Sequence, residues 1–273
     1  MRTKTLIPVL LIVLAGLTVG VWSRHSGVQA QNTVWRPKPG TTFQWQLAGQ
    51  PIDSSVQASA YMIDLYANDA SVVKDLAARG RKVICYTNLG VRDDFLPDKD
   101  AFPPEVIGKP WNGSSTSRWL DIRKSDQFAA AIRARLDLCK DKGFDAVGPD
   151  NMEAYKNDSG FPLTAADQLK FNRFLANEAH ARGLSIGLHN DADQAEELAP
   201  WFDWALTEDC FGADWCKKME AFTGTGKAVF MVEYREKIGL PKFQLEVCAL
   251  AKKFRYTALL KPQDLSADRD TCN

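Results

Sequence analysis

The stretch with the clearest chemical character is FDAVGPDNMEAY, which spans residues 144–155. The apolar residues 144–147 predict a buried strand, and a glycine and a proline then place Asp150 and Asn151 at its end. In α/β proteins, side chains at the carboxyl ends of parallel strands line the rim where ligands bind. Asp150 is therefore the first candidate for a catalytic carboxylate. The alternative, that Asp150 caps a helix and Asn151 fixes a turn, stays open on this motif alone.

Polar residues end most of the other strand-like runs as well. These residues are Gln46, Asp64, Asn88, Asp121, Asn151, His189, Asn190, Glu208, Asp209 and Glu233. Their aromatic neighbours are Trp45, Tyr86, Trp119, Tyr155, Phe211 and Tyr234. Sugar rings stack on aromatic faces, and sugar hydroxyls form hydrogen bonds with carboxylates and amides. In a barrel these side chains would share one rim, so the pattern predicts a carbohydrate site.

Hydrolysis of a glycosidic bond needs two carboxyl groups, one to protonate the leaving oxygen and one to act as nucleophile or base. Asp150 and Glu208 follow predicted strands that are two apart, so they can face each other across a barrel mouth. Glu233 follows the next strand and could orient either carboxylate. Alternatively, Glu208 begins a helix beside a disulfide, and Glu233 forms a salt bridge to Arg235 or Lys237. We predict Asp150 and Glu208 as catalytic residues. The predicted substrate-binding residues are Trp45, Gln46, Asp64, Tyr86, Asn88, Asp121, Asn151, Tyr155, His189, Asn190, Glu233 and Tyr234.

The elements that would position these residues alternate between strand-like and helical patterns. The strand-like runs are 43–47, 61–66, 82–90, 118–122, 144–147, 184–190, 203–209, 228–234 and 255–260, and the helical ones 68–79, 125–142 and 163–182. This alternation favours a single-domain α/β fold, a (β/α)8 TIM-like barrel, over an open doubly wound sheet. Nine strands exceed the eight of a barrel, so one is peripheral or the barrel is modified. The long irregular segment 91–118 predicts a lid or binding wall.

The amino terminus has the features of an export signal. Arg2 and Lys4 precede the uncharged run 5–23, and a small-residue cleavage site ends at Ala30. We expect cleavage after Ala30, a leader at 31–42 and a barrel domain at 43–273, in a secreted or cell-surface protein. The alternative is an uncleaved membrane anchor, which would be the protein's only contact with a membrane. A monomer is expected.

Charge and cysteine content exclude several partners and cofactors. The chain has 34 basic and 34 acidic residues, and cleavage after residue 30 removes three basic ones, which leaves 34 − 3 = 31. No basic patch is available for nucleic acid. Six cysteines allow fifteen pairings, of which we favour Cys210–Cys216, with Cys85–Cys139 and Cys248–Cys272 completing the set. The chain has no C-x-x-C, G-x-S-x-G or G-x-G-x-x-G motif, so neither a metal nor a cofactor is expected.

Several runs together resemble glycoside hydrolase family 114, the endo-α-1,4-polygalactosaminidase family with a TIM-barrel fold. The runs are WQL (45–47), IDSS (52–55), VICYTNLG (83–90), WLDIR (119–123), RLDLCKDKGFDAVGPDN (135–151), GL with Asn190 (187–190), TEDCF (207–211) and GKAVFMVEY (226–234). The resemblance implies endo-acting hydrolysis of an α-1,4-linked galactosamine-containing polysaccharide, with Asp150 and Glu208 at the positions of the two proposed catalytic acids. An acidic rim would attract such a cationic amino-sugar polymer.

Four positions depart from the family pattern. Met62 stands where an aspartate is usual, Gly148 where an acid precedes P-D-N, His189 where a lysine precedes Asn190, and Leu96 where an arginine is common. Three of them are expected at strand ends near the presumed cleft. They raise the alternative of a catalytically impaired, carbohydrate-binding relative of the same barrel.

Overall fold

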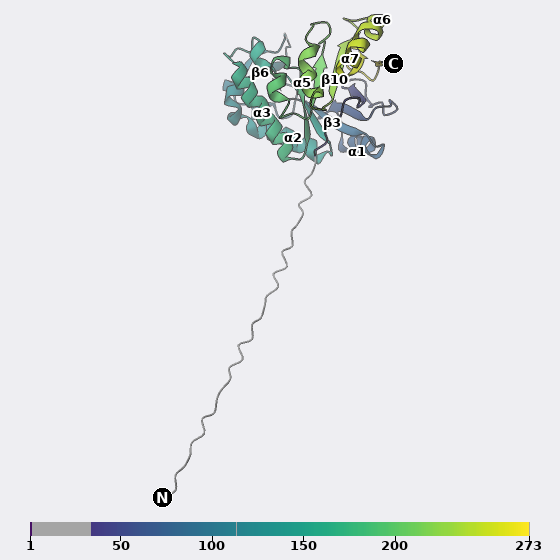
Figure 1. Ribbon diagram of the computed structural model, residues 1–273. Helices are drawn as coiled ribbons and strands as arrows, with labels where there is room; N and C mark the ends of the chain where they lie inside the picture. Colours follow the sequence, from purple (N-terminus) through teal and green to yellow (C-terminus); the bar gives the residue numbers. More distant parts are fainter. Residues whose placement is uncertain (2–33, 113, 273) are drawn as a thin grey trace. The chain divides into compact units, whose positions relative to one another are not determined.

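The main sheet contains nine strands, and its neighbouring strands are parallel except at the last pair. In sheet order these are β1 (Phe43–Gln46), β2 (Ala60–Asp64), β3 (Lys82–Asn88), β7 (Ala146–Asp150), β8 (Ser185–His189), β9 (Trp204–Glu208), β10 (Val229–Tyr234), β11 (Thr257–Lys261) and β12 (Asp270–Thr271). The parallel strands are neighbours in chain order, as in a (β/α)8 barrel. The sheet curls, and the predicted barrel fold is confirmed (Figure 1).

The computed structural model describes residue 1, residues 34–112 and residues 114–272. The predicted export signal, apart from Met1, and the start of the leader lie outside these residues. Residues 33–273 form one unit by their contacts. Among the described residues, no helix combines the length and the apolar character that a membrane span requires.

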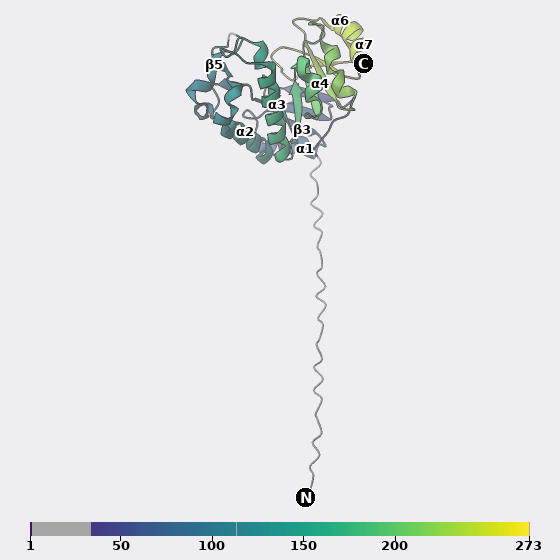
Figure 2. The ribbon, with the colours of Figure 1, turned by 60° about the vertical axis from the view of Figure 1, so that its left-hand side comes forward.

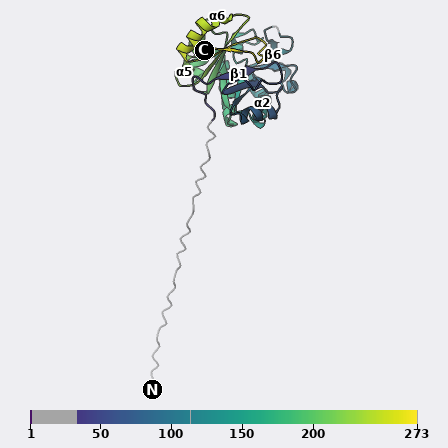
Figure 3. The ribbon, with the colours of Figure 1, turned by 90° about the vertical axis from the view of Figure 1, so that its right-hand side faces the viewer.

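The barrel seam is closed by the segment that follows β11. Within the described residues no ladder pairs β11 with β1. Instead, the backbone N–H of Leu47 donates to the carbonyl of Leu265 at 2.9 Å, and the side chain of Gln44 donates to the carbonyl of Ala267 at 2.6 Å. Arg269 donates to the carbonyl of Phe43. Figure 3 shows β1 on the same side of the molecule as the carboxyl terminus.

Helices lie outside the strands. They are α1 (Ala70–Ala78), α2 (Ala129–Asp141), α3 (Ala165–Ala181), α4 (Ala195–Leu198), α5 (Glu220–Thr223), α6 (Leu240–Lys242) and α7 (Cys248–Phe254). Short helical turns are η1 (Lys99–Ala101), η2 (Pro104–Val106), η3 (Ile122–Gln127), η4 (Ala154–Lys156), η5 (Ala192–Gln194), η6 (Cys216–Met219) and η7 (Phe243–Val247). A capping box begins α3, because Thr164 and Asp167 exchange hydrogen bonds. In Figure 2, α3 and α2 lie on the same side of the sheet.

The extra predicted strand belongs to a second sheet. β6 (Ser117–Leu120) pairs antiparallel with both β4 (Val91–Asp93) and β5 (Ile107–Pro110). The prediction of 91–118 as irregular is therefore wrong in part, because this segment holds most of a three-stranded sheet. Buried Asp93 accepts hydrogen bonds from Ser117 and from Asn88 Nδ2. These contacts tie the small sheet to the end of β3.

The barrel interior is apolar below its carboxyl end. Phe43, Met62, Ile84, Ala146, Trp204 and Phe230 are among the buried residues of this cluster. A Cβ on Gly148 would lie 2.6 Å from Met62 Sδ, and one on Gly187 would lie 2.4 Å from the Trp204 ring. Two of the family departures are thus in contact, because Met62 fills the space that a side chain at Gly148 would need.

Three disulfides connect the cysteines in the pairs that the sequence favours. They are Cys85–Cys139, Cys210–Cys216 and Cys248–Cys272. The first joins the inner strand β3 to the outer helix α2, and the second closes a short loop just after β9. Because all six cysteines are in disulfides, the thiolates that a zinc site would need are not available.

Removing the disulfide that closes the longer loop should be the more destabilising change. Cys85 and Cys139 are separated by 54 residues and Cys210 and Cys216 by 6. Loop-closure entropy gives the first about 4 kcal/mol of stabilisation and the second about 2 kcal/mol. We expect the Cys85→Ala/Cys139→Ala double variant to lose more free energy of unfolding in urea than Cys210→Ala/Cys216→Ala. Equal losses, or the reverse order, would contradict this entropic account.

Candidate active site

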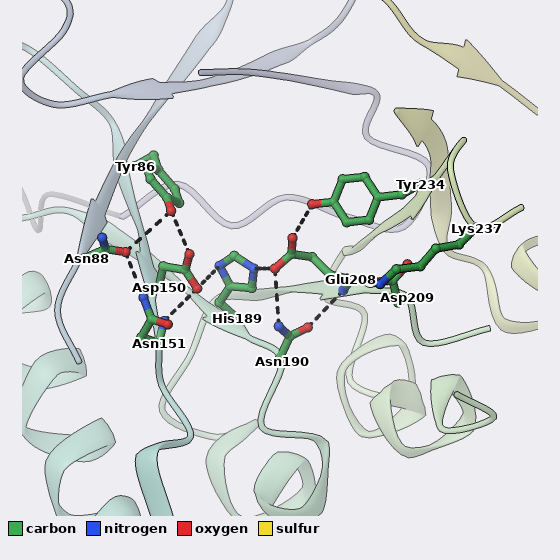
Figure 4. Close-up of polar contacts among 10 residues, drawn as sticks. All are labelled: Tyr86, Asn88, Asp150, Asn151, His189, Asn190, Glu208, Asp209, Tyr234 and Lys237. Carbon is green, nitrogen blue, oxygen red and sulfur yellow. Dashed lines mark hydrogen bonds and ion pairs between the residues drawn. The ribbon is translucent and has the colours of Figure 1, made fainter. Parts of the chain in front are cut away.

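Six strand-end side chains line one cavity at the carboxyl end of the barrel. They are Trp45, Tyr86, Asp150, His189, Glu208 and Tyr234, and the cavity has a volume of about 460 Å³. Side chains alternate between the two faces of a strand, so these six point inward like the core residues two positions before them. Figure 4 shows five of them, with Asp150, His189 and Glu208 next to one another.

Asp150 is fixed at the end of β7 by two hydrogen-bond donors. The Tyr86 hydroxyl donates to Oδ2 at 2.7 Å, and the Asn151 backbone N–H donates to Oδ1 at 2.6 Å. Asn151 has a left-handed backbone with φ 62°, and its side chain donates to Asn88. A Cβ on Gly90 would lie 1.8 Å from the Asn151 carbonyl oxygen, so glycine is required there. The turn after β7 therefore holds Asp150 facing the cavity.

Glu208 accepts three side-chain hydrogen bonds at the end of β9. His189 Nε2 lies 2.6 Å from Oε2, Asn190 Nδ2 donates to the same oxygen at 3.4 Å, and the Tyr234 hydroxyl donates to Oε1. Burial alone would raise the pKa of Glu208. The charge and hydrogen bond of His189, together with Tyr234 and Asn190, instead hold this pKa below its usual value. Glu208 is therefore stabilised as a carboxylate.

His189 lies between the two acids. Its Nδ1 is 3.5 Å from Asp150 Oδ1, and its side chain is 2% exposed, against 20% for Asp150 and 23% for Glu208. Burial opposes the charged imidazole, but Asp150 and Glu208 raise the pKa of His189 to about 9. An oxygen of Asp150 lies within 4.8 Å of an oxygen of Glu208. The floor of the cavity is thus an ion-paired triad.

The same triad has the ligand types of a metal site, as does the group of Cys210, Cys216 and Glu233. Nε2 and Nδ1 of His189 instead face Glu208 and Asp150 as ion-pair partners, at 2.6 Å and 3.5 Å. The two cysteines are joined in a disulfide. Both groups therefore fit structural or acid–base roles better than metal binding.

The loops around the triad complete the cavity with residues outside the predicted catalytic and substrate-binding sets, although Trp119 and Asp209 were expected at the rim. The added residues are Trp111, Asn112, Trp119, Met152, Glu153, Asn157, Asp209, Gln263 and Leu265. The first three come from the small sheet and the turn between β5 and β6, so segment 91–118 does contribute a wall. The two tryptophans in or next to a long irregular segment were the available signal. Gln263 and Leu265 belong to the seam segment and had no sequence signal of this kind.

Two predicted binding residues point away from the cavity because they lie on the opposite face of their strands from the residues that line it. Gln46 follows inward-facing Trp45, and its amide donates to the Gly49 carbonyl at 2.8 Å. Glu233 precedes inward-facing Tyr234, is fully buried, and accepts from the Phe211 backbone N–H at 2.8 Å. Burial raises the pKa of Glu233 to about 7.

Four further predicted residues also lie outside the cavity walls. Asp64 accepts from two backbone N–H groups of the turn after β2, each at 2.7 Å. Asn88 supports Asn151 rather than the cavity. Asp121 follows the small sheet, is 1% exposed and pairs with a neighbouring arginine at 2.7 Å. Tyr155 lies in η4, where burial and the charge of Asp191 raise its pKa. Asn151 and Asn190, in contrast, line the cavity as expected.

Comparison with known proteins connects this geometry to a family. The model of glycoside-hydrolase family GH114 matches residues 25–273. The structure of Ega3 from Aspergillus fumigatus in complex with galactosamine is 35% identical, with a TM-score of 0.82, over 87% of this chain and 97% of that one. The glycoside hydrolase domain of PelA from Pseudomonas aeruginosa has the same fold at 14% identity, with a TM-score of 0.67, over 85% and 98% of the chains. A search among curated proteins finds no match. The family match covers most of the chain, so the chain belongs to glycoside-hydrolase family GH114.

Proposed function

We propose that this glycosidase is an exported, endo-acting enzyme that cleaves α-1,4-linked galactosamine-containing polysaccharide, with Asp150 and Glu208 as its catalytic pair. The observation that carries the proposal is the approach of these two carboxylates within 4.8 Å on the cavity floor. The family match supports carbohydrate hydrolysis. Galactosamine in the Ega3 structure supports an amino-sugar substrate for this chain.

We infer a retaining mechanism from the closest pair of carboxylate oxygens, which lie within 4.8 Å of each other. Retaining glycosidases hold their two carboxyl groups about 5 to 5.5 Å apart, whereas inverting ones leave about 6.5 to 9.5 Å for a water molecule. We assign Asp150 as the nucleophile, oriented by the Tyr86 hydroxyl. Glu208 is then the acid and base, because the protonated His189 beside it can supply a proton. Both side chains are partly exposed to the cavity, as attack on a bound sugar requires.

The cavity walls suit a cationic sugar polymer. The acids Asp150, Glu153, Glu208 and Asp209 line them, and His189 is the one cationic side chain among the described lining residues. Aromatic rings, among them three tryptophans, can stack on the sugar faces. A second hollow of about 290 Å³ shares Glu153 and Asn190 with the first. Two adjoining hollows support binding of more than one sugar unit, which an endo-acting enzyme needs.

Export fits the chemistry of the body of the chain. Three disulfides form and persist in oxidising compartments outside the cytosol. With the predicted signal at residues 1–30, they support secretion or a cell-surface location. Export of either kind would also bring the enzyme to an extracellular polysaccharide.

Neutralising either carboxylate should abolish hydrolysis without unfolding the protein. We expect Asp150→Asn and Glu208→Gln each to lower kcat by about 100-fold or more, because each removes one of two required acid–base groups. The assay is release of reducing ends from α-1,4-galactosaminogalactan and its deacetylated form. Asp137→Asn, which removes a carboxylate from the outer helix α2 at a 57% exposed side chain, is the control with ordinary activity.

Two results would contradict the proposal. Activity retained by either variant would remove that residue from the catalytic pair. Polysaccharide binding by the unmodified protein with no product formed would instead identify the chain as a carbohydrate-binding relative, the alternative that Met62, Gly148 and His189 raise.

Salt should weaken substrate binding more than catalysis. Between about 0.1 M and about 1 M salt the Debye length falls from about 10 Å to about 3 Å, so attraction between a cationic polymer and the acidic cavity is screened. We expect KM for the deacetylated polymer to rise severalfold over this range while kcat changes little. The N-acetylated polymer, which is uncharged, is the matched substrate control, and an equal rise in its KM would argue against electrostatic capture.

A further inference from the structure

We propose that His189 stores the proton that Glu208 delivers to the leaving sugar, so that acid catalysis in this site is a relay from imidazole through carboxyl to substrate. The inference rests on the proposed hydrolase activity of Asp150 and Glu208. It assigns a function to one of the positions at which this chain departs from its family.

Among the residues that the structure describes, two carboxylate oxygens lie near the nitrogens of His189. Nε2 is 2.6 Å from Glu208 Oε2, and Nδ1 is 3.5 Å from Asp150 Oδ1. Nδ1 is buried and has no hydrogen-bond partner among the described residues. The Trp45 ring packs edge-on against the imidazole, with centroids 5.6 Å apart. The ring is therefore held with one nitrogen toward each catalytic carboxylate.

The charge on His189 depends on these same carboxylates. The ionisable groups facing it are Asp150 from β7, Glu208 from β9 and Glu153 from the loop after β7, and all three favour the protonated imidazole. Tyr86 and Tyr234 contribute neutral hydroxyls that bond the carboxylates. The ammonium of Lys237 is paired with Asp209, and this contact, with a smaller effect of the Glu208 charge, raises the pKa of Lys237.

Among the described residues, the layer of the barrel interior below the triad is apolar. Met62 and Gly148 pack against each other within the apolar cluster around Trp204. A histidine, with an ordinary pKa of about 6.5, releases a proton more readily than a lysine, with an ordinary pKa of about 10.4, would at this position.

The reaction itself would drive the proton transfer. As an oxygen of Asp150 bonds to the anomeric carbon, the bond to the leaving oxygen breaks and its electron pair stays on that oxygen. Asp150 becomes a neutral ester, so His189 loses one of the charges that hold its proton. Glu208 begins as a carboxylate. It accepts the proton from His189 Nε2 and donates a proton to the leaving oxygen, so it is a carboxylate again at the end of this step.

The second half-reaction restores the starting charges. Water attacks the anomeric carbon, and the bond to Asp150 breaks with its electron pair returning to the carboxylate. Glu208 accepts the proton from water and returns a proton to His189. The relay therefore consumes one water molecule and needs no other reactant.

Substrates with different leaving groups test the relay. A sugar alcohol must be protonated as it leaves, whereas 2,4-dinitrophenolate leaves without a proton. We expect His189→Gln to lower kcat on the polymer by about 100-fold or more, the usual range for a lost general acid. On 2,4-dinitrophenyl α-galactosaminide we expect a loss below about tenfold, because acid catalysis contributes little there.

The pH profile gives a second readout. The protonated histidine is the active form, so activity of the unmodified enzyme on the polymer is present below a pH of about 9 and is lost as pH rises through that value. In His189→Gln this basic limb should move to lower pH, because Glu208 must then hold the proton alone. In His189→Lys, which keeps the charge, the limb should move to higher pH with a reduced kcat.

His180→Gln is the matched control, because His180 lies on α3 and pairs with Asp203 away from the cavity. It should leave unchanged both the basic limb of the pH profile and the ratio of kcat on the polymer to kcat on the dinitrophenyl substrate. If His189 had a purely structural role, His189→Gln would lower kcat on both substrates equally and leave the basic limb of the pH profile in place. That result would overturn the relay. His189→Lys provides the same test if His189→Gln does not fold, as judged by circular dichroism.

Failure of the broader proposal would look different. If the unmodified enzyme cleaves neither substrate, or if Glu208→Gln retains full activity on the polymer, the catalytic pair itself is wrong. The relay alone is rejected by a different set of results. In that case the unmodified enzyme is active and Asp150→Asn is inactive, but His189→Gln loses the same activity on both leaving groups.

Discussion

For two carboxyl groups within 4.8 Å of each other inside a barrel mouth to be ionised at the same time, a positive charge and hydrogen-bond donors must accompany them. Like charges at this distance repel, and partial burial removes the water that would otherwise solvate them. His189 supplies the charge, and the hydroxyls of Tyr86 and Tyr234 bond one oxygen of each acid. Removing His189 would leave the two acids close together with no cation between them.

The barrel meets this requirement through alternation and a shaped interior. Strand-end side chains point inward from β7, β8 and β9 because they lie on the same strand face as the interior residues Ala146, Ser185 and Leu206. Gly148 and Gly187 have no side chain, and Met62 and Trp204 fill the space. The layer below the triad is therefore dry and apolar, which strengthens electrostatic interactions in the layer above it.

Much of the fold was predictable because it depends on local pattern: short apolar runs, helix caps and turn residues recur along the chain. The strand-end rule also led to the acids that meet in the cavity. It could not give the direction of each side chain, since a shift of one residue reverses the face, as Glu233 and Gln46 show. The small sheet and the seam depend on contacts between distant segments, such as Asp93 with Ser117 and Leu47 with Leu265, which periodicity does not reveal.

The seam has a consequence for how the protein matures. Residues 262–269 both join β1 to the end of the parallel sheet and contribute Gln263 and Leu265 to the cavity. Beyond them, Cys272 is linked to Cys248 on α7. Because synthesis proceeds from the amino terminus, the first strand must wait for this late segment. A nascent chain that has not yet released it has an unfinished cleft, so the enzyme stays latent during its own synthesis.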